Sequence, residues 1–222
     1  MTFPVHTGSK TSMDGVFMKK FGKFIGLLLL LVSAFQLGII ANEKQILAEN
    51  LIRLHVVADS DSAEDQNVKL QVRDAITEKL GSVMEQMPDM QSAKEYIQAQ
   101  LPVLEGIANE VLRSAGSACK AVVTFAKETF PTREYDTFAL PAGVYESLRV
   151  TIGSGEGKNW WCVVFPRLCV SATSVGFEDT AVSAGFSDEL AGSLTGKPQY
   201  KVRFFLLDCF GWLENWIYEK DF

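Results

Sequence analysis

Two segments of the chain carry apolar side chains at helical spacing. The first predicts a helix that begins at Ser62, with Asp65 at the third helical position, where it can return the capping hydrogen bond. Its apolar stripe comprises Val68, Val72, Ile76, Leu80, Val83, Met84 and Met87. The second stripe comprises Ala93, Tyr96, Ile97, Leu101, Leu104, Ala108, Val111 and Leu112. Pro102 inside it predicts a kinked helix or two abutting helices, and Gly116 is a suitable stop.

Other segments have the patterns of strands. Residues 51–58 form a nearly continuous apolar run that predicts a buried strand, and residues 119–125 predict a second. Residues 133–140 are expected to form a third strand. Residues 145–152 alternate apolar and polar side chains, as a half-buried strand does. Glycine-rich residues 153–157 then predict a hairpin loop into a strand that carries two adjacent tryptophans.

The pattern weakens toward the C-terminus. Residues 171–199 are rich in Ser, Thr, Gly and Asp with little apolar periodicity, so a flexible loop is predicted there. Residues 200–207 are predicted to return as a strand, and residues 208–218 to form a short aromatic-rich helix. With helices in one block and strands in another, the order favours an α+β fold, a two-layer sandwich in which helices pack on a mostly antiparallel sheet.

The N-terminus has the pattern of an export signal. Lys19, Lys20 and Lys23 precede an apolar run over residues 24–41, which is the arrangement of a basic region before a hydrophobic region. The run is at the short end of a membrane-spanning helix, so both a cleaved signal and an uncleaved anchor stay open. Translation could begin at Met1, Met13 or Met18.

Composition excludes some partners. Residues 1–41 hold four of the 21 Lys and Arg residues and one of the 27 Asp and Glu residues, which leaves a net charge of −9 on the remainder. Such an acidic surface argues against nucleic acid and against electrostatic docking on anionic lipid. We therefore expect no nucleic-acid partner, and membrane contact only through the N-terminal segment.

Two polar motifs invite a ligand and are better explained without one. The Gly-x-Gly-x-Gly of residues 153–157 links two predicted strands rather than a strand and a helix N-terminus, so a plain loop is favoured over a phosphate site. Asp59, Asp61, Glu64 and Asp65 could hold calcium, but helix capping and the helix dipole account for them. The prediction is no cofactor and no metal.

The cysteines favour a structural role. Cys162 and Cys169 frame six residues around Pro166, and a turn can bring them within reach of a disulfide. A disulfide in an oxidising compartment is favoured over paired free thiols. A thiol nucleophile or zinc site with His55 is less favoured, because the surrounding sequence matches no thiol-protease signature. No catalytic residue is predicted.

Several motifs resemble those of the stage II sporulation protein R family. The most specific is the run from Gly153 to Cys169, which contains Asn-Trp-Trp-Cys-Val-x-Phe-Pro-x-Leu-Cys. The others are Arg-Leu-His-Val-Val-Ala-Asp-Ser-Asp-Ser at residues 53–62, Asp65-Gln66 with the Lys69–Ala75 run, and Leu-Pro-Ala-Gly-x-Tyr at residues 140–145. The resemblance covers residues 51–170. Asp59 stands where the family usually has Asn, and Arg167 where a second proline is common.

The resemblance implies a non-enzymatic signalling protein, made in the forespore and exported into the intermembrane space. There, such proteins are thought to activate a membrane-embedded aspartic protease that processes the sigma-E precursor. The implied organisation is a signal or anchor at residues 1–41, a signalling domain at 42–170, a loop at 171–199 and a C-terminal strand and helix at 200–222. The residues expected to bind the extracytoplasmic face of the protease are Trp160, Trp161, Arg53, His55 and Asp61.

Two other functions stay open: a secreted cell-wall or glycan-binding module that stacks sugars on Trp160 and Trp161, and, less favoured, a thiol hydrolase. Consecutive strand residues face opposite ways, so one tryptophan should pack on the helical layer and the other should stand at the surface. We predict that Trp161 is the inward one, because it shares a face with Val163 and Phe165.

Overall fold

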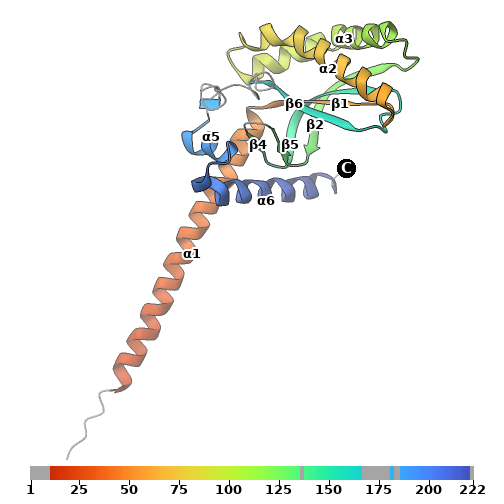
Figure 1. The fold of residues 1–222 in the computed structure, drawn as a ribbon. Coiled ribbons are helices and arrows are strands. Elements are labelled where there is room, and N and C mark those ends of the chain that lie inside the picture. Colours follow the sequence, from red (N-terminus) through yellow and green to blue (C-terminus); the bar gives the residue numbers. More distant parts are fainter. Residues whose placement is uncertain (1–10, 136–137, 167–180, 183–185, 221–222) are drawn as a thin grey trace, which may run out of the picture. The chain divides into compact units, whose positions relative to one another are not determined.

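The computed structural model describes residues 11–135, 138–166, 181–182 and 186–220 (Figure 1). The chain divides into two compact units, Met1–Ala41 and Asn42–Phe222. The first helix, α1 (Thr11–Glu49), contributes to both units. Its stretch Lys20–Glu49 is long and apolar enough to cross a membrane, judged by length and composition. A signal or an anchor is compatible with this finding.

A four-stranded sheet is the centre of the second unit. Its strands are β1 (Ile52–Val57), β2 (Ala121–Phe130), β5 (Gly143–Ile152) and β6 (Asn159–Phe165), in the order β2-β5-β1-β6. β1 is parallel to β5, whereas β1–β6 and β2–β5 are antiparallel pairs. Every residue of β1 is buried, which suits its position inside the sheet.

The connection after β5 differs from the predicted hairpin. β5 and β6 are not neighbours, because β1 lies between them. Residues 153–158 therefore pass across the end of β1 instead of joining two paired strands. The hairpin prediction is wrong because a glycine-rich turn signal between two strands is local, and it cannot exclude a third strand inserted from elsewhere in the chain.

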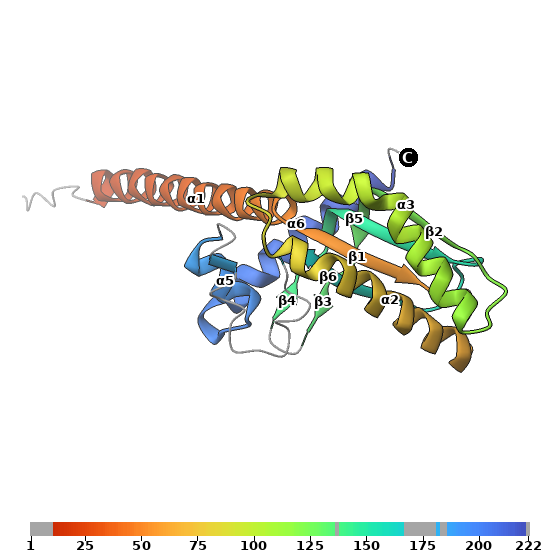
Figure 2. The same ribbon diagram turned by 90° about the horizontal axis from the view of Figure 1, so that it is seen from above.

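Two helices, α2 (Ala63–Met84) and α3 (Met90–Ser114), cover one face of the sheet (Figure 2). The Ser62 hydroxyl accepts a hydrogen bond from the Asp65 N–H at 3.1 Å and donates one to its carboxylate at 2.9 Å, which confirms the predicted cap. α3 runs through Pro102 as one helix. Gly116 follows its end with φ +74°, and the Ser117 N–H bonds back to the Leu112 carbonyl, as in a Schellman motif.

The core lies between this helical layer and the sheet. Both predicted stripes point into it, with Val72, Ile76, Ile97 and Leu104 fully buried. The α+β prediction with a mostly antiparallel sheet is confirmed.

The predicted strand over residues 133–140 is instead a small hairpin. β3 (Arg133–Glu134) pairs with β4 (Ala139–Leu140), and the Tyr135 N–H donates to the Phe138 carbonyl at 2.7 Å. The rings of Tyr135 and Phe138 stack with centroids 4.6 Å apart. One strand was predicted over this segment, but the chain turns back after two residues.

The C-terminal segment is helical. It comprises α5 (Asp188–Leu194), a 3-10 turn (η2, Pro198–Tyr200) and α6 (Lys201–Tyr218), so the strand predicted at residues 200–207 is wrong. Local β propensity of its valine and phenylalanines suggested a strand, whereas burial of Leu207 and Gly211, four residues apart, requires a helix. α5 also corrects the predicted loop at 171–199, most of whose remaining residues lie outside those described.

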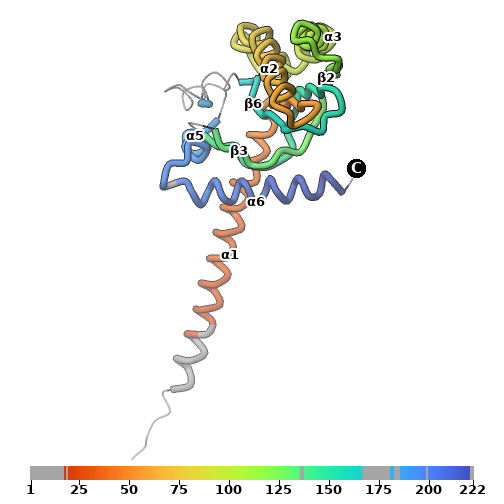
Figure 3. Tube along the Cα trace, turned by 45° about the vertical axis from the view of Figure 1, so that its right-hand side comes forward, coloured from red at the N-terminus to blue at the C-terminus, as the bar shows by residue number. Residues whose placement is uncertain are grey.

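α6 packs on the side of the sheet opposite α2 and α3 (Figures 1 and 3). Asn215 donates to the Phe130 carbonyl at 2.9 Å, and Asp208 accepts from the Ala142 N–H at 2.8 Å. The last turns of α1, within the second unit, are bonded to it by Lys44, whose Nζ lies 2.7 Å from a Glu214 carboxylate oxygen.

Candidate functional site

The sheet face turned away from α2 and α3 carries polar and aromatic side chains rather than an aliphatic core. Because side chains alternate along a strand, every second residue of β1, β5 and β6 reaches this face. The polar and aromatic ones among them are Arg53, His55, Tyr145, Ser147, Arg149, Thr151, Asn159 and Trp161, and the buried Val57 and Val163 lie on the same face. Glu128 and Phe130 of β2 and the β3–β4 hairpin complete the group.

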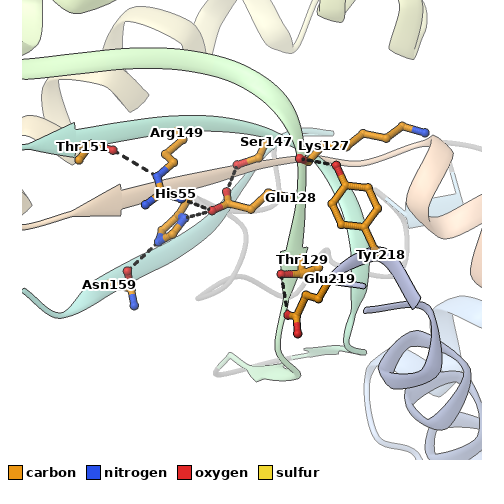
Figure 4. A network of polar contacts seen from close by, with 10 residues as sticks. All are labelled: His55, Lys127, Glu128, Thr129, Ser147, Arg149, Thr151, Asn159, Tyr218 and Glu219. Carbon is orange, nitrogen blue, oxygen red and sulfur yellow. Dashed lines mark hydrogen bonds and ion pairs between the residues drawn. The ribbon is translucent and has the colours of Figure 1, made fainter. Parts of the chain in front are cut away.

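His55 lies at the centre of a hydrogen-bonded network (Figure 4). Its Nδ1 is 2.9 Å from a Glu128 carboxylate oxygen, and its Nε2 is 2.8 Å from the Asn159 side-chain oxygen. The imidazole stacks on the Trp161 ring at 5.5 Å and meets the Phe130 ring edge-on. Both ring nitrogens are therefore engaged, and the side chain is only 6% exposed. His55 therefore holds Glu128 and Asn159 by hydrogen bonds and the Trp161 ring by stacking.

Glu128 collects three donors from two other strands, β1 and β5. Besides His55, Ser147 donates its hydroxyl at 2.8 Å and Arg149 a guanidinium nitrogen at 2.7 Å. Burial acts to raise the pKa of Glu128. Three neighbours act in the opposite direction: His55 by its hydrogen bond and charge, Ser147 by its hydroxyl, and Arg149 by its charge. Together they hold the pKa of Glu128 below its ordinary value. The carboxylate thus stays ionised and ties β1, β2 and β5 together.

Arg53 is fully buried, which is rare for an arginine. Its guanidinium lies over the rings of Phe130 at 4.1 Å and Tyr145 at 5.0 Å, and Nη2 donates to the Tyr135 hydroxyl at 3.2 Å. Its Nε and Nη1 have no hydrogen-bond partner among the described residues. Burial raises the pKa of the Tyr145 phenol, which therefore stays neutral and supplies no counter-charge.

Arg133 brings a second guanidinium group to the same place from the hairpin. It lies 3.5 Å from the centroid of the Trp161 ring. Burial lowers the pKa of Arg133, nearby Tyr135 raises it, and the charge of Arg53 lowers it further, so the two arginines are close enough to repel. The Arg133 Nε is buried without a hydrogen-bond partner in the part of the chain that the structure describes.

We call Arg53, His55, Arg133, Tyr135 and Trp161 the arginine cluster. It presents guanidinium donors beside flat aromatic rings, with Glu128 already committed to His55, Ser147 and Arg149. Guanidinium groups with spare donors suit a carboxylate or another oxygen anion.

Asp59 and Asp61, for which helix capping was expected, bind the backbone of a distant loop instead. Asp59 accepts the Ser154 N–H at 2.6 Å, and Asp61 accepts the Lys158 N–H at 2.7 Å. The hydrogen bonds to Ser154 lower the pKa of Asp59. Neither residue caps α2, so helix capping explains only Asp65. Asp59 and Asp61 instead fasten the glycine loop, residues 153–157, over the end of β1.

The glycines of this loop allow the close approach. The Gly157 N–H donates to the Ala58 carbonyl at 3.0 Å, and a Cβ at Gly157 would stand 2.3 Å from the Ser60 carbonyl oxygen. Among the described residues, no group of three or more His, Cys, Asp or Glu side chains could hold a metal.

The two tryptophans lie on opposite faces and Trp161 is the less exposed of them, as predicted, but the prediction that Trp161 packs on the helical layer is wrong. Trp160 is on the α2 side, 37% exposed, with the Arg73 guanidinium 4.3 Å from its ring centroid. Trp161 shares a face with Val163 as expected, but this is the face of the arginine cluster. Alternation could not reveal which face the helices cover.

Cys162 is buried on the helical side, facing away from His55. This arrangement does not pair the thiol with the imidazole. Cys169 lies outside the described residues, so its disulfide with Cys162 stays a prediction. Cys119 and Cys209 are free.

Of the five residues expected to bind a partner, the structure brings together Arg53, His55 and Trp161. Asp61 belongs to the glycine loop and Trp160 to the α2 side. Sequence reasoning missed Arg133, Tyr135, Glu128 and Asn159. The alternation of side chains along a strand could have placed Asn159 on the same face as Trp161. No comparable sequence pattern pointed to Arg133 and Tyr135 in the hairpin.

Comparison with known proteins identifies the family. The family model described as stage II sporulation protein R matches residues 48–174. The chain belongs to this family. Stage II sporulation protein R of Bacillus subtilis (strain 168) is 33% identical over 163 residues, covering 71% of this chain and 73% of that protein. No solved structure matches.

The matched region contains the whole sheet, α2, α3 and the arginine cluster, whereas α6 lies beyond it. Membership supports a role in sporulation, and the family is named for that process rather than for an enzymatic activity.

Proposed function

We propose that this protein is a secreted sporulation signal that activates a membrane-embedded aspartic protease, which then processes the sigma-E precursor. Family membership supports the sporulation role, and the apolar segment of α1 is compatible with export from the forespore. The proposed partner surface is the extracytoplasmic face of the protease.

The observation that carries this proposal is the set of unsatisfied guanidinium donors on Arg53 and Arg133. A buried donor without a partner costs about 1–3 kcal/mol, and a carboxylate or carbonyl of the protease that reaches the partly exposed Arg133 would recover that cost. Arg53 is fully buried, so it contributes its charge from inside the cluster rather than a direct contact. Trp161 and Tyr135 add aromatic surface beside these donors, and Arg, Trp and Tyr are the residues enriched in interface hot spots.

The geometry supports the two alternatives less well. A thiol hydrolase needs a nucleophile beside a base, but Cys162 points to the other face and both His55 nitrogens are taken. A glycan platform needs both tryptophans on one surface, whereas Trp160 and Trp161 lie on opposite faces.

The test is complementation of an endospore former that lacks its own copy. We expect Arg133→Ala to abolish processing of the sigma-E precursor on immunoblots while the exported protein stays at its normal level. Arg113→Ala is the matched control, because Arg113 is an exposed arginine of α3 that forms an ion pair with its helix neighbour Glu110, away from the cluster. Normal processing with Arg133→Ala would contradict a role for the cluster in activation.

A further inference from the structure

The outer face of α6 is apolar and exposed. Phe205 is 63% exposed and Trp212 is 70% exposed, and both lie on the side of the helix opposite the buried Leu207. The outer stripe of α6 consists of Val202, Phe205, Cys209, Trp212, Leu213 and Trp216, all exposed. Large aromatic side chains repeated along one helix face are unusual on a surface that meets only water.

Packing of α6 on the domain does not use this stripe. The inner side is so close to the sheet connection that a Cβ on Gly211 would stand 1.6 Å from the Ala142 carbonyl oxygen. The inner carboxylates, Asp208 and Glu214, are bonded to the Ala142 N–H and to Lys44. The helix is therefore fixed by one face, and the other is available to a further surface.

Chain connectivity places a membrane near that surface. The apolar run ends at Ala41, and Glu43 and Lys44 follow within three residues. Three residues reach at most about 11 Å, whatever direction the segment takes. Arg203, in the first turn of α6, bonds Glu43, and Glu214, near the end of α6, bonds Lys44. Both halves of α6 are therefore held to residues 43–44. When residues 24–41 span a bilayer, α6 is held close to its headgroup layer.

The chemistry of the stripe suits that layer. Tryptophan is enriched at membrane–water interfaces, and Phe and Leu can enter the acyl boundary. Two charged groups flank the stripe at its end: Lys220, whose Nζ lies 3.7 Å from the centroid of the Trp216 ring, and the exposed Glu219. The net negative charge of the domain does not oppose this contact, because the attraction is apolar.

We propose that α6 lies in the membrane interface and forms a second membrane contact of the protein, beyond the N-terminal segment. The contact holds the domain against the bilayer surface from which the segment emerges. This inference rests on residues 24–41 serving as an anchor, and it does not require the protease to be the partner.

The exposed thiol of Cys209 lies in the stripe and offers a reporter. The full chain with Cys119→Ser, Cys162→Ser and Cys169→Ser leaves Cys209 as the one thiol of the sequence. This variant, carrying one NBD fluorophore on Cys209, would be reconstituted in phosphatidylcholine vesicles, and the control below also carries Cys162→Ser and Cys169→Ser. We expect loss of NBD fluorescence when shallow nitroxide lipids are added, and little loss with aqueous iodide. A matched control carries the label on Val103→Cys in a Cys119→Ser, Cys209→Ser background, because Val103 is exposed on α3. That label should be quenched by iodide and not by the lipids.

A second variant tests the stripe itself. Adding Phe205→Ser and Trp212→Ser should reverse the quenching at Cys209, with helical circular dichroism and vesicle retention unchanged. Quenching of the Cys209 label by iodide alone would overturn the proposal. So would protection from both quenchers that is lost on dilution, which would indicate a second copy of the chain on the stripe. Unchanged lipid quenching in the double variant would also overturn it.

Discussion

The two faces of the central sheet are built from alternate residues of the same strands, but they use those residues differently. Toward α2 and α3, side chains such as Leu54, Val56 and Leu148 are aliphatic and fully buried. On the opposite face, Arg53 and His55 occupy the intervening positions of β1 among aromatic rings. The first face gains stability from burial, whereas the second keeps buried donors unsatisfied. The comparison suggests that stability and recognition are separated across one layer of strands.

The largest expected effect is on the helical face. Leu104→Ala removes a fully buried side chain from α3 and should lower the free energy of unfolding by about 2–5 kcal/mol. Urea denaturation of purified protein measures the change. Val103→Ala, an exposed neighbour, should change it little. Equal effects of the two substitutions would mean that α3 does not pack as described.

A smaller loss is expected where the glycine loop closes over β1. Gly157→Ala places a methyl group against the Ser60 carbonyl, and the forced shift should cost about 1–3 kcal/mol. Gly106→Ala is the control, because that glycine lies in α3 with nothing within 4 Å, and alanine there should stabilise by about 0.5–1 kcal/mol. Thermal unfolding of both variants would compare them. A neutral Gly157→Ala would argue against a tightly fastened loop.

The network around Glu128 predicts an acid-sensitive contribution. Its pKa is lower in the folded protein, so the stabilisation is present above the ordinary glutamate pKa of about 4.3 and is lost as the pH falls through the folded value. Glu128→Gln should therefore lose less stability than the wild type as the pH falls from about 4.3 through the folded pKa of Glu128. Urea midpoints measured at several pH values test this, with Glu78→Gln on the exposed side of α2 as the control.

The smallest change in stability is expected at Arg53, where the comparison is sharpest. Arg53→Met keeps an unbranched apolar stem and removes a buried charge with unsatisfied donors. The free energy of unfolding should fall by less than about 1 kcal/mol or rise. Processing of the sigma-E precursor should nevertheless be lost. A strongly destabilised Arg53→Met would show that this residue holds the fold, and the separation between the faces would fail.

Sequence patterns predicted the helical face well and the opposite face poorly, for a physical reason. Periodic apolar residues such as Val72, Ile76 and Ile97 mark a core directly, because burial of each depends only on its own position along a helix. The arginine cluster depends on Arg133 and Tyr135 meeting β1 and β6, which is a matter of tertiary adjacency. The position of β1 between β5 and β6 was missed for the same reason, since no local signal records a partner that lies far along the chain.

The C-terminal helix shows a related limit. Residues 200–207 have β propensity taken alone, and only contacts with the sheet connection and with Lys44 favour α6. The aspartates were noticed as a group, but hydrogen bonds to Ser154 and Lys158 could not be foreseen from residues almost a hundred positions away.

The inner position of β1 also sets an order in time. This strand is made early, yet both of its neighbours, β5 and β6, are made much later. Until residues 143–165 arrive, β1 has two unpaired edges and exposed apolar side chains, which is a state prone to aggregation. A chain that leaves its compartment N-terminus first therefore cannot close this sheet before most of the domain has crossed. Closure of the sheet is the step that brings Arg53 and Trp161 together. For a chain exported as proposed, the proposed partner surface therefore forms only after passage is nearly complete.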